Sequence, residues 1–261
     1  MSDLADPAAA LRSLHRPGSP LVLPNAWDVP SALLVEQAGF PVVGTSSAAM
    51  LEAIGHHDGG NAPVGDVFAA VARIAKAVTV PVTADLEDGY GLPPAEIVDR
   101  LLDAGAVGCN LEDSDHRHRG CLVDAEVQAE RIEAVRAAGR ACGVDLVVNA
   151  RIDTWVRQVG NPDNRLEETQ RRAVLYSSAG ADCVFPILIP EAQIRPFMAS
   201  WQGNVNVLAS PDRQTVTRLA SFGVARISMG PRLSSAVWQF LAELLGEIAP
   251  PSFCRHGPRP L

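Results

Sequence analysis

Short apolar segments alternate with longer stretches of helical composition along most of this chain. The apolar segments are rich in valine and isoleucine and lack a clean alternation of polar and apolar positions, as parallel strands covered on both faces do. They lie at 21–24, 41–45, 80–84, 107–111, 145–150, 182–186, 204–208 and 223–228. The stretches between them predict helices, and several open with Pro or Asp and close with Gly. These predicted helices lie at 28–38, 65–78, 94–104, 126–141, 165–179, 190–200, 212–221 and 231–248.

This repeated strand-then-helix order predicts an α/β fold with a single (β/α)8 TIM barrel. Parallel strands need helical crossovers, and no change in composition divides the units. A doubly wound open sheet is the alternative fold. No Gly-x-Gly-x-x-Gly follows a predicted strand, which argues against a dinucleotide site. We expect the barrel domain to occupy residues 1–249 and residues 250–261, rich in proline, to form a flexible C-terminal tail.

Composition limits the partners of the chain. Its 261 residues, 47% of them hydrophobic, suit one barrel, and a net charge of -8 with a pI near 5.2 would repel a nucleic-acid backbone. No apolar run approaches the roughly 20 residues that span a bilayer, and the start lacks the basic segment of a signal peptide. The five cysteines include no C-x-x-C pair, so neither a disulfide framework nor a zinc site is indicated. We expect a cytoplasmic protein without nucleic-acid or membrane partners.

Several predicted strands end in polar residues. The run Pro81-Val-Thr-Ala-Asp-Leu-Glu-Asp-Gly-Tyr-Gly91, for example, passes from β-branched residues to three acids. In a barrel the chemistry sits at the C-terminal ends of the strands, so these polar residues should meet at one mouth. They are Asn25, Thr45, Ser46, Ser47, Asp85, Glu87, Glu112, Arg151 and Asp153.

The expected mouth combines acids with one arginine. Asp85, Glu87 and Glu112 offer hard oxygen ligands without His or Cys beside them, which suits Mg²⁺ or Mn²⁺ held partly through water. Arg151 is expected to hold a carboxylate through two parallel hydrogen bonds while the metal polarises a neighbouring oxygen. The backbone amides of Ser46 and Ser47 would add to this site. The predicted ligand is therefore a small 2-oxo acid.

At these residues the chain resembles the isocitrate lyase/phosphoenolpyruvate mutase superfamily. The resemblance extends from Leu23-Pro-Asn-Ala-Trp-Asp28 to Gly223-Val-Ala-Arg-Ile-Ser-Met-Gly-Pro231. It implies that Thr45, Ser46 and Ser47 line the substrate carboxylate and that Asp58 lies on a mobile loop above it. It also implies that Asp85 anchors Mg²⁺ through water and that Glu87 and Glu112 are outer-sphere carboxylates.

The resemblance extends to the later strands and to the assembly. Arg151 matches the arginine of the family's fifth strand, and Asn206 matches a polar residue of the seventh, expected to bind substrate. The family also implies a homodimer or homotetramer in which a C-terminal helix is exchanged between subunits. Residues 232–247 are expected to form that helix.

The segment 112–124, which acts as a gating loop in the family, departs from the named activities. Isocitrate and methylisocitrate lyases carry Lys-(Lys or Arg)-Cys-Gly-His there, with the cysteine transferring the proton. Cys121 has neither the preceding lysines nor the following Gly-His, and the lysines and asparagine of the mutases are also missing. The family's Asp-x-Asp appears here as Asp85-x-Glu87.

These features predict a Mg²⁺-dependent lyase that cleaves a C–C bond of a small 2-oxo or 2-hydroxy carboxylate through a pyruvate-like enolate. The metal and Arg151 would stabilise the oxyanion, and His116, His118, Cys121 or a water on Glu112 would donate the proton. One alternative is a phosphonate-related (C–P) mutase or hydrolase, or an oxaloacetate-type hydrolase or decarboxylase. The other is a non-catalytic barrel that binds a carboxylate. A short loop of His and Arg is also typical of a solvated face.

Overall fold

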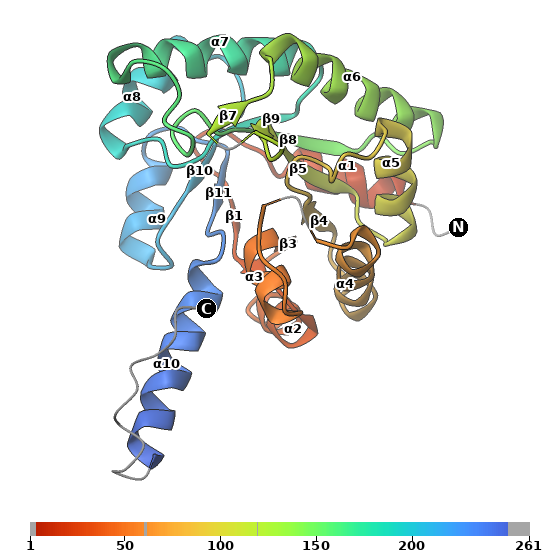
Figure 1. Cartoon of the computed structure of the whole chain (residues 1–261), viewed down its shortest axis with the longest axis vertical. Helices are drawn as coiled ribbons and strands as arrows, with labels where there is room; N and C mark the ends of the chain where they lie inside the picture. The colour runs from red at the N-terminus through yellow and green to blue at the C-terminus, as the bar shows by residue number, and fades with distance from the viewer. Residues whose placement is uncertain (1–3, 60–61, 119, 250–261) are drawn as a thin grey trace.

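The computed structural model describes residues 4–59, 62–118 and 120–249 (Figure 1). The predicted tail at 250–261, with Cys254, lies outside the described residues. Within them, the predicted order of strands and helices is confirmed, and most boundaries fall within two or three residues of the expected positions.

Parallel strands form a ring. One sheet has the order β2 (Asn25–Ala26), β3 (Val43–Thr45), β4 (Val82–Asp85), β5 (Gly108–Glu112), β8 (Val147–Ile152), β9 (Cys183–Pro186), and a second has the order β1 (Leu21–Leu23), β11 (Arg226–Ser228), β10 (Asn206–Leu208). The sheets meet at both edges. On one side β1 and β2 are successive parts of one extended segment, and on the other Val184 pairs with Val205 in a parallel bridge. The α/β class and the barrel-like arrangement are thereby confirmed.

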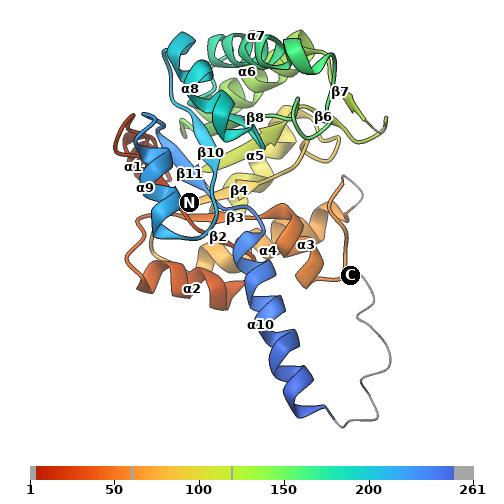
Figure 2. The same cartoon turned by 90° about the vertical axis from the view of Figure 1, so that its left-hand side faces the viewer.

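Helices follow the strands and cover the outside of the ring (Figures 1 and 2). Aspartates begin three of them, since Asp28, Asp124 and Asp212 accept backbone N–H groups of the first turn. The covering helices are α2 (Val29–Gln37), α4 (Val64–Ala77), α5 (Pro94–Asp103), α6 (Ala125–Ala141), α7 (Arg165–Ser178), α8 (Glu191–Ser200) and α9 (Arg213–Ala220).

The last helix, α10 (Arg232–Ile248), is different, because it points away from the ring (Figures 1 and 2). Ser234 is the one residue of this helix that is buried within the chain. Six of its large apolar side chains are exposed: Val237, Phe240, Leu241, Leu244, Leu245 and Ile248.

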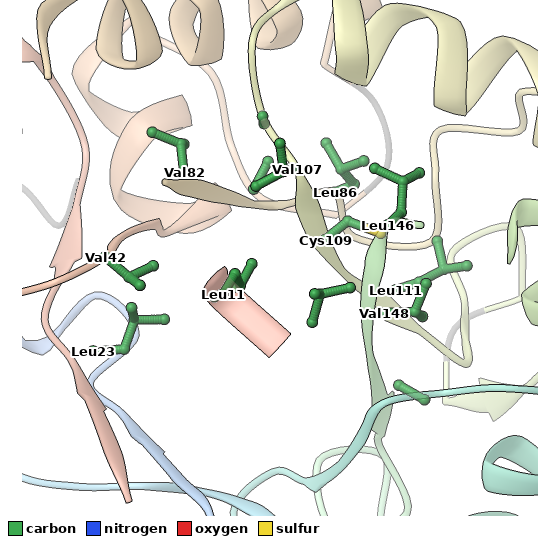
Figure 3. Packing of buried hydrophobic residues seen from close by; sticks show 14 of the residues in the cluster. Leu11, Leu23, Val42, Val82, Leu86, Val107, Cys109, Leu111, Leu146 and Val148 are labelled. Atoms are coloured by element: carbon green, nitrogen blue, oxygen red, sulfur yellow. The ribbon is translucent and has the colours of Figure 1, made fainter. Parts of the chain in front are cut away.

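An N-terminal helix, α1 (Ala5–Ser13), was not expected from the sequence and closes the end of the ring at which the strands begin. Its Leu11 is fully buried, and Figure 3 shows this side chain surrounded by apolar residues that include Leu23, Val42 and Val82. Arg12 fixes the helix, since its guanidinium donates to Asp182 (2.7 Å) and to backbone carbonyl oxygens that precede β8. The opposite end, where the strands finish, is left for a site.

Three further elements also went unpredicted: α3 (Ser47–Ala53), a 3-10 helix (Pro162–Asn164), and an antiparallel hairpin of β6 (Ser114–Asp115) and β7 (Cys121–Leu122). The hairpin lies in the segment expected to gate the mouth. None of the helices in the described part of the chain is both long enough and apolar enough to cross a bilayer.

Candidate active site

The rim of the ring brings together side chains from four neighbouring strands. Thr45, Asp85 and Glu112 are the last residues of β3, β4 and β5, and Arg151 is the penultimate residue of β8. These strands are adjacent in the sheet, and Glu112 is paired in register with Arg151. The expectation that strand ends converge on one mouth is confirmed for these four positions.

Asp85 is fixed from the side of β3. Its Oδ2 accepts the Ser47 hydroxyl (3.0 Å) and backbone N–H (3.3 Å), and its own N–H donates to the Thr45 hydroxyl (2.9 Å). Ser46 is used differently, because its hydroxyl caps α3 by accepting from the Ala49 N–H. The other oxygen of Asp85, Oδ1, is buried and has no hydrogen-bond partner among the described residues.

Asp58 and Gly59 lie near the acids that follow β4. The Gly59 N–H donates to Oε2 of Glu87 (2.8 Å), which is itself buried. Asp58 is exposed as a residue, yet the pKa of its carboxyl group is raised, first by desolvation and second by the charge of Asp85. The carboxyl group of Asp58 is therefore close enough to Asp85 to be affected by its charge, and its role on a loop above the substrate stays a prediction.

Glu112 lies between a histidine and an arginine. Its Oε1 lies 2.7 Å from Nε2 of His116, and its Oε2 lies 2.7 Å from Nη1 of Arg151. Burial raises the pKa of Glu112, although Arg151 opposes the shift. The pKa of His116 is also raised, mainly by the hydrogen bond to Glu112. The pair is thus arranged to share a proton at the rim.

Arg151 is held rigidly. Its Nε and Nη2 donate to the two oxygens of Asp153 (2.7 and 2.8 Å), while Nη1 meets Glu112. Asp153 is buried and is fixed in turn by the Ser114 hydroxyl (2.6 Å). Burial by itself lowers the pKa of Arg151, but Glu112, Asp153 and Asp85 outweigh it and raise the pKa well above its ordinary value. Each terminal nitrogen of a guanidinium carries two hydrogens, so one on each remains for a ligand.

Two residues of the hairpin lie away from this cluster. His118 is exposed, and its Nδ1 lies 2.9 Å from Asp115, while Cys121 is exposed on β7. Among the described residues, no hydrogen bond or ion pair joins either side chain to Asp85, Glu112 or Arg151. The structure therefore places His116, and neither of the other two, at the rim.

Asn206 lies inside the ring. It is fully buried and exchanges hydrogen bonds with Ser228 (3.1 and 3.2 Å). Nearby, Arg226 reaches across from β11 to Oδ1 of Asn110 on β5 (3.1 Å), which also accepts from Asn149 (2.8 Å). A polar layer thus lies within the barrel, and the sequence analysis had assigned only Asn206 to a site.

Two further residues at the rim were missed. Nε of Arg157 donates to Ser114 (2.9 Å), and its Nη2 lies 3.5 Å from Nδ1 of His116, so it braces the hairpin. Tyr90 follows β4 in a turn and buries its hydroxyl group near the acids. The one sequence signal for Tyr90 was its place between two glycines directly after the Asp85-x-Glu87 motif.

Comparison with known proteins connects this geometry to a family. A family model described as phosphoenolpyruvate phosphomutase matches residues 11–249, which is most of the chain. The chain belongs to the phosphoenolpyruvate phosphomutase family. The predicted membership of the isocitrate lyase/phosphoenolpyruvate mutase superfamily is therefore confirmed.

Relatives within this superfamily are enzymes of more than one kind. A solved structure from Burkholderia cenocepacia J2315, proposed to be a phosphonomutase, is 39% identical, covers 92% of this chain and 99% of its own, and has a TM-score of 0.86. The 2-methylisocitrate lyase of Escherichia coli is 28% identical over 79% of this chain and 70% of its own length. A 2,3-dimethylmalate lyase structure is 25% identical, covers 97% of this chain and 88% of its own, and has a TM-score of 0.79.

Proposed function

We propose that this protein is a lyase that cleaves a C–C bond of a small 2-oxo or 2-hydroxy carboxylate through a pyruvate-like enolate. The observation that carries the proposal is the rigid placement of Arg151 by Asp153 and Glu112, within reach of the charge of Asp85. Two relatives of the chain, 2-methylisocitrate lyase and 2,3-dimethylmalate lyase, are lyases by name.

Arg151 would bind the substrate carboxylate. Asp153 and Glu112 fix the plane of its guanidinium, so little side-chain entropy is lost when a ligand binds. Its positive charge persists in the buried site because three carboxylates raise its pKa. Ser47 and Thr45, which already contact Asp85, would line the same carboxylate.

The acids of the rim fit Mg²⁺, with Mn²⁺ as an alternative. The described residues contain no group of three His, Cys, Asp or Glu side chains closed around a metal position. The buried Oδ1 of Asp85 is nevertheless an oxygen without a donor, which suits an ion held by one carboxylate and by waters that reach Glu87 and Glu112. When bound, the ion would supply Lewis-acid polarisation of the 2-oxo oxygen.

His116 and Glu112 would handle the proton. The hydrogen bond between Nε2 and Oε1 (2.7 Å) holds a proton next to Arg151, and both groups have raised pKa values. A proton held there is in place to reach the carbon of an enolate bound by Arg151. Asp58, from above, would add a second acid to the mouth.

The proposal is tested by incubating the protein with Mg²⁺ and 2-methylisocitrate, isocitrate, 2,3-dimethylmalate or oxaloacetate, and measuring release of 2-oxo acid with a coupled dehydrogenase. We expect cleavage of at least one substrate, lost on addition of a chelator. Arg151→Lys should lose about 100-fold in rate, because lysine cannot form the paired hydrogen bonds. The matched variant Arg171→Lys, at an exposed position of α7, should keep its rate.

Two other results are informative. Stabilisation by oxalate and Mg²⁺ without turnover of any substrate would replace the lyase with the carboxylate-binding barrel. No response to any of these acids would contradict the proposed ligand class.

Phosphonate chemistry is the second candidate, because the solved relative at 39% identity is proposed to be a phosphonomutase. Phosphonopyruvate therefore belongs in the same panel, with phosphorus NMR as the readout. Conversion of this compound, with no cleavage of the carbon substrates, would favour the C–P reaction over the lyase.

We also propose that the chain forms a homodimer or homotetramer through α10. The exposed apolar side chains of this helix have no cover within the described chain, and patches of this kind mark protein–protein contacts. Near its start, Trp238 lies 6.3 Å from Trp27, ring centre to ring centre. The remainder of the helix would pack on a second copy.

A further inference from the structure

The chain makes an unusual turn directly after β4. Glu87 (φ 49°), Gly89 (φ 81°), Tyr90 (φ 56°) and Gly91 (φ 70°) all adopt the left-handed backbone region. Glycine does so without cost, but Glu and Tyr are strained there. Strain of this kind persists where the surrounding structure enforces it, and such positions cluster at functional sites.

Backbone hydrogen bonds hold the turn in place. The Gly89 N–H donates to the Leu86 carbonyl (2.7 Å), the Tyr90 N–H donates to Oδ1 of Asp88 (2.8 Å), and the Leu92 N–H donates to the Gly89 carbonyl (3.0 Å). Gly89 is also packed tightly, because a Cβ there would lie 2.7 Å from a methyl carbon of Ile97. The strained conformation of Tyr90 is therefore enforced locally.

The result of this turn is a buried phenol among carboxylates. The Tyr90 hydroxyl is buried without a hydrogen-bond partner among the described residues. Burial raises its pKa far above the ordinary value, and the charges of Glu87, Asp85 and Asp58 raise it further. Glu87 acts on the phenol through its charge and also as a side-chain partner that raises the pKa. No acceptor among the described residues, however, meets the hydroxyl within hydrogen-bond distance and angle.

We propose that the Tyr90 hydroxyl donates a hydrogen bond to an anionic oxygen of the ligand at this rim. The inference rests on the proposed function, in which that ligand is a 2-oxo acid with a carboxylate held by Arg151. An acidic rim repels such a ligand wherever it offers only acceptors, and a phenol that stays protonated supplies a donor there. A buried donor without a hydrogen-bond partner is costly. A ligand whose oxygen accepts this hydrogen bond therefore binds more tightly.

The chain offers a matched control, because it contains only two tyrosines. The Tyr176 hydroxyl is also buried, but it is satisfied, donating to Asp113 (2.7 Å) and accepting from Arg172 (3.0 Å). Replacement of this hydroxyl removes a structural hydrogen bond. Replacement of the Tyr90 hydroxyl removes a donor that has no hydrogen-bond partner among the described residues.

The first test is isothermal titration of oxalate, a mimic of a pyruvate enolate, in the presence of Mg²⁺. We expect Tyr90→Phe to bind oxalate about tenfold or more weakly than the wild type, with no loss of melting temperature. Tyr176→Phe should melt at a lower temperature and bind oxalate within about twofold of the wild type. Weaker binding in one variant and lower stability in the other would distinguish a role of the hydroxyl in ligand binding from a role in packing.

A second readout needs no turnover. Fluorotyrosine incorporated throughout the chain gives one ¹⁹F signal per tyrosine, and the two phenylalanine variants assign them. Oxalate with Mg²⁺ should shift the Tyr90 signal and leave the Tyr176 signal in place.

The outcomes distinguish this inference from the function on which it rests. Oxalate binding by the wild type, with equal affinity in Tyr90→Phe and an unmoved signal, would overturn the role of Tyr90 and leave the lyase proposal standing. A lower melting temperature for Tyr90→Phe with unchanged affinity would assign the hydroxyl to structure alone. Failure of the wild type to bind oxalate or any 2-oxo acid would overturn both.

Discussion

A single oxygen atom, Oδ1 of Asp85, carries much of the case for a metal at the rim. It is buried without a donor among the described residues, whereas Oδ2 is held by Ser47. A carboxylate oxygen in that state is costly unless a cation or an ordered water meets it.

Asp85→Asn should therefore abolish Mg²⁺-dependent stabilisation by oxalate. The amide keeps the shape of the side chain but loses the charge, so we expect oxalate affinity to fall by more than about tenfold while the fold persists. Thermal shift with and without Mg²⁺ measures the effect. Asp103→Asn, at an exposed position near the end of α5, is the control. A response like that of the wild type in Asp85→Asn would contradict the metal assignment.

His15, at the closed end of the barrel, should make stability depend on pH. Its Nδ1 donates to the Leu11 carbonyl (3.0 Å), and burial, followed by the charge of Arg226, lowers its pKa to about 4. The unfolded chain protonates His15 near pH 6.5, whereas the folded chain does so only near pH 4. The contribution of neutral, buried His15 to the free energy of unfolding is therefore complete above pH 6.5 and is lost as the pH falls toward 4. Between pH 7 and pH 5 this histidine should lower the free energy of unfolding by about 2 kcal/mol.

Urea unfolding at the two pH values checks this prediction. His15→Asn retains a donor for Leu11 but has no ring to protonate, so its loss of stability on acidification should be smaller by about that amount. His57→Asn, at an exposed position, should behave as the wild type does. Parallel pH profiles for all three proteins would show that His15 is not the group responsible.

At the scale of elements, two glycines in the turn after β4 allow the cost of backbone strain to be measured apart from the cost of side-chain crowding. Gly89 and Gly91 both have positive φ, but a Cβ at Gly89 would meet Ile97 (2.7 Å) and Arg131 (2.8 Å), and a Cβ at Gly91 would meet nothing within 4 Å. We expect Gly91→Ala to cost about 1 kcal/mol and Gly89→Ala about 2–4 kcal/mol. Equal free energies of unfolding for the two variants would mean that the turn relaxes.

The β6–β7 hairpin distinguishes between the candidate proton donors that the sequence left as alternatives. It turns His116 toward Glu112 and leaves His118 and Cys121 exposed. For the substrate that the panel identifies, we expect His116→Asn to lose at least about tenfold in kcat. His118→Asn and Cys121→Ser should stay within about twofold of the wild type, as exposed residues outside the chemistry do. A large loss of kcat in Cys121→Ser would restore the cysteine as the donor.

At the scale of the whole molecule, α10 should decide the assembly. Light scattering should find a dimer or tetramer for the wild type, and Phe240→Glu with Leu244→Glu should shift it to monomer, because the charges would be buried at the contact. Gln239→Glu, on the same helix at an exposed polar position, should leave the assembly intact. A wild type that is monomeric, or a double variant of unchanged mass, would refute the role of this helix.

Local sequence determined the strand and helix order, because each predicted element shows its own pattern. Apolar runs of valine and isoleucine predicted the strands, and prolines, aspartates and glycines predicted where most helices begin and end. Since parallel strands end on one face of a barrel, the positions of Asp85, Glu112 and Arg151 at the mouth followed directly. Helix α1 was missed because its role, filling the end of the barrel with Leu11, depends on strands distant in sequence.

Tertiary structure alone decided how the polar side chains are paired. Arg226 crosses the barrel to Asn110, which lies 116 residues away, and Arg151 is held by both Asp153 and Glu112. No periodicity in the chain encodes such contacts, because they depend on which strands the closed ring places opposite or beside one another. The inward turn of His116 and the strained turn at Tyr90 are likewise fixed by packing around them. The sequence thus determined the scaffold and the types of residue at its rim, and the folded barrel decided which of them face one another.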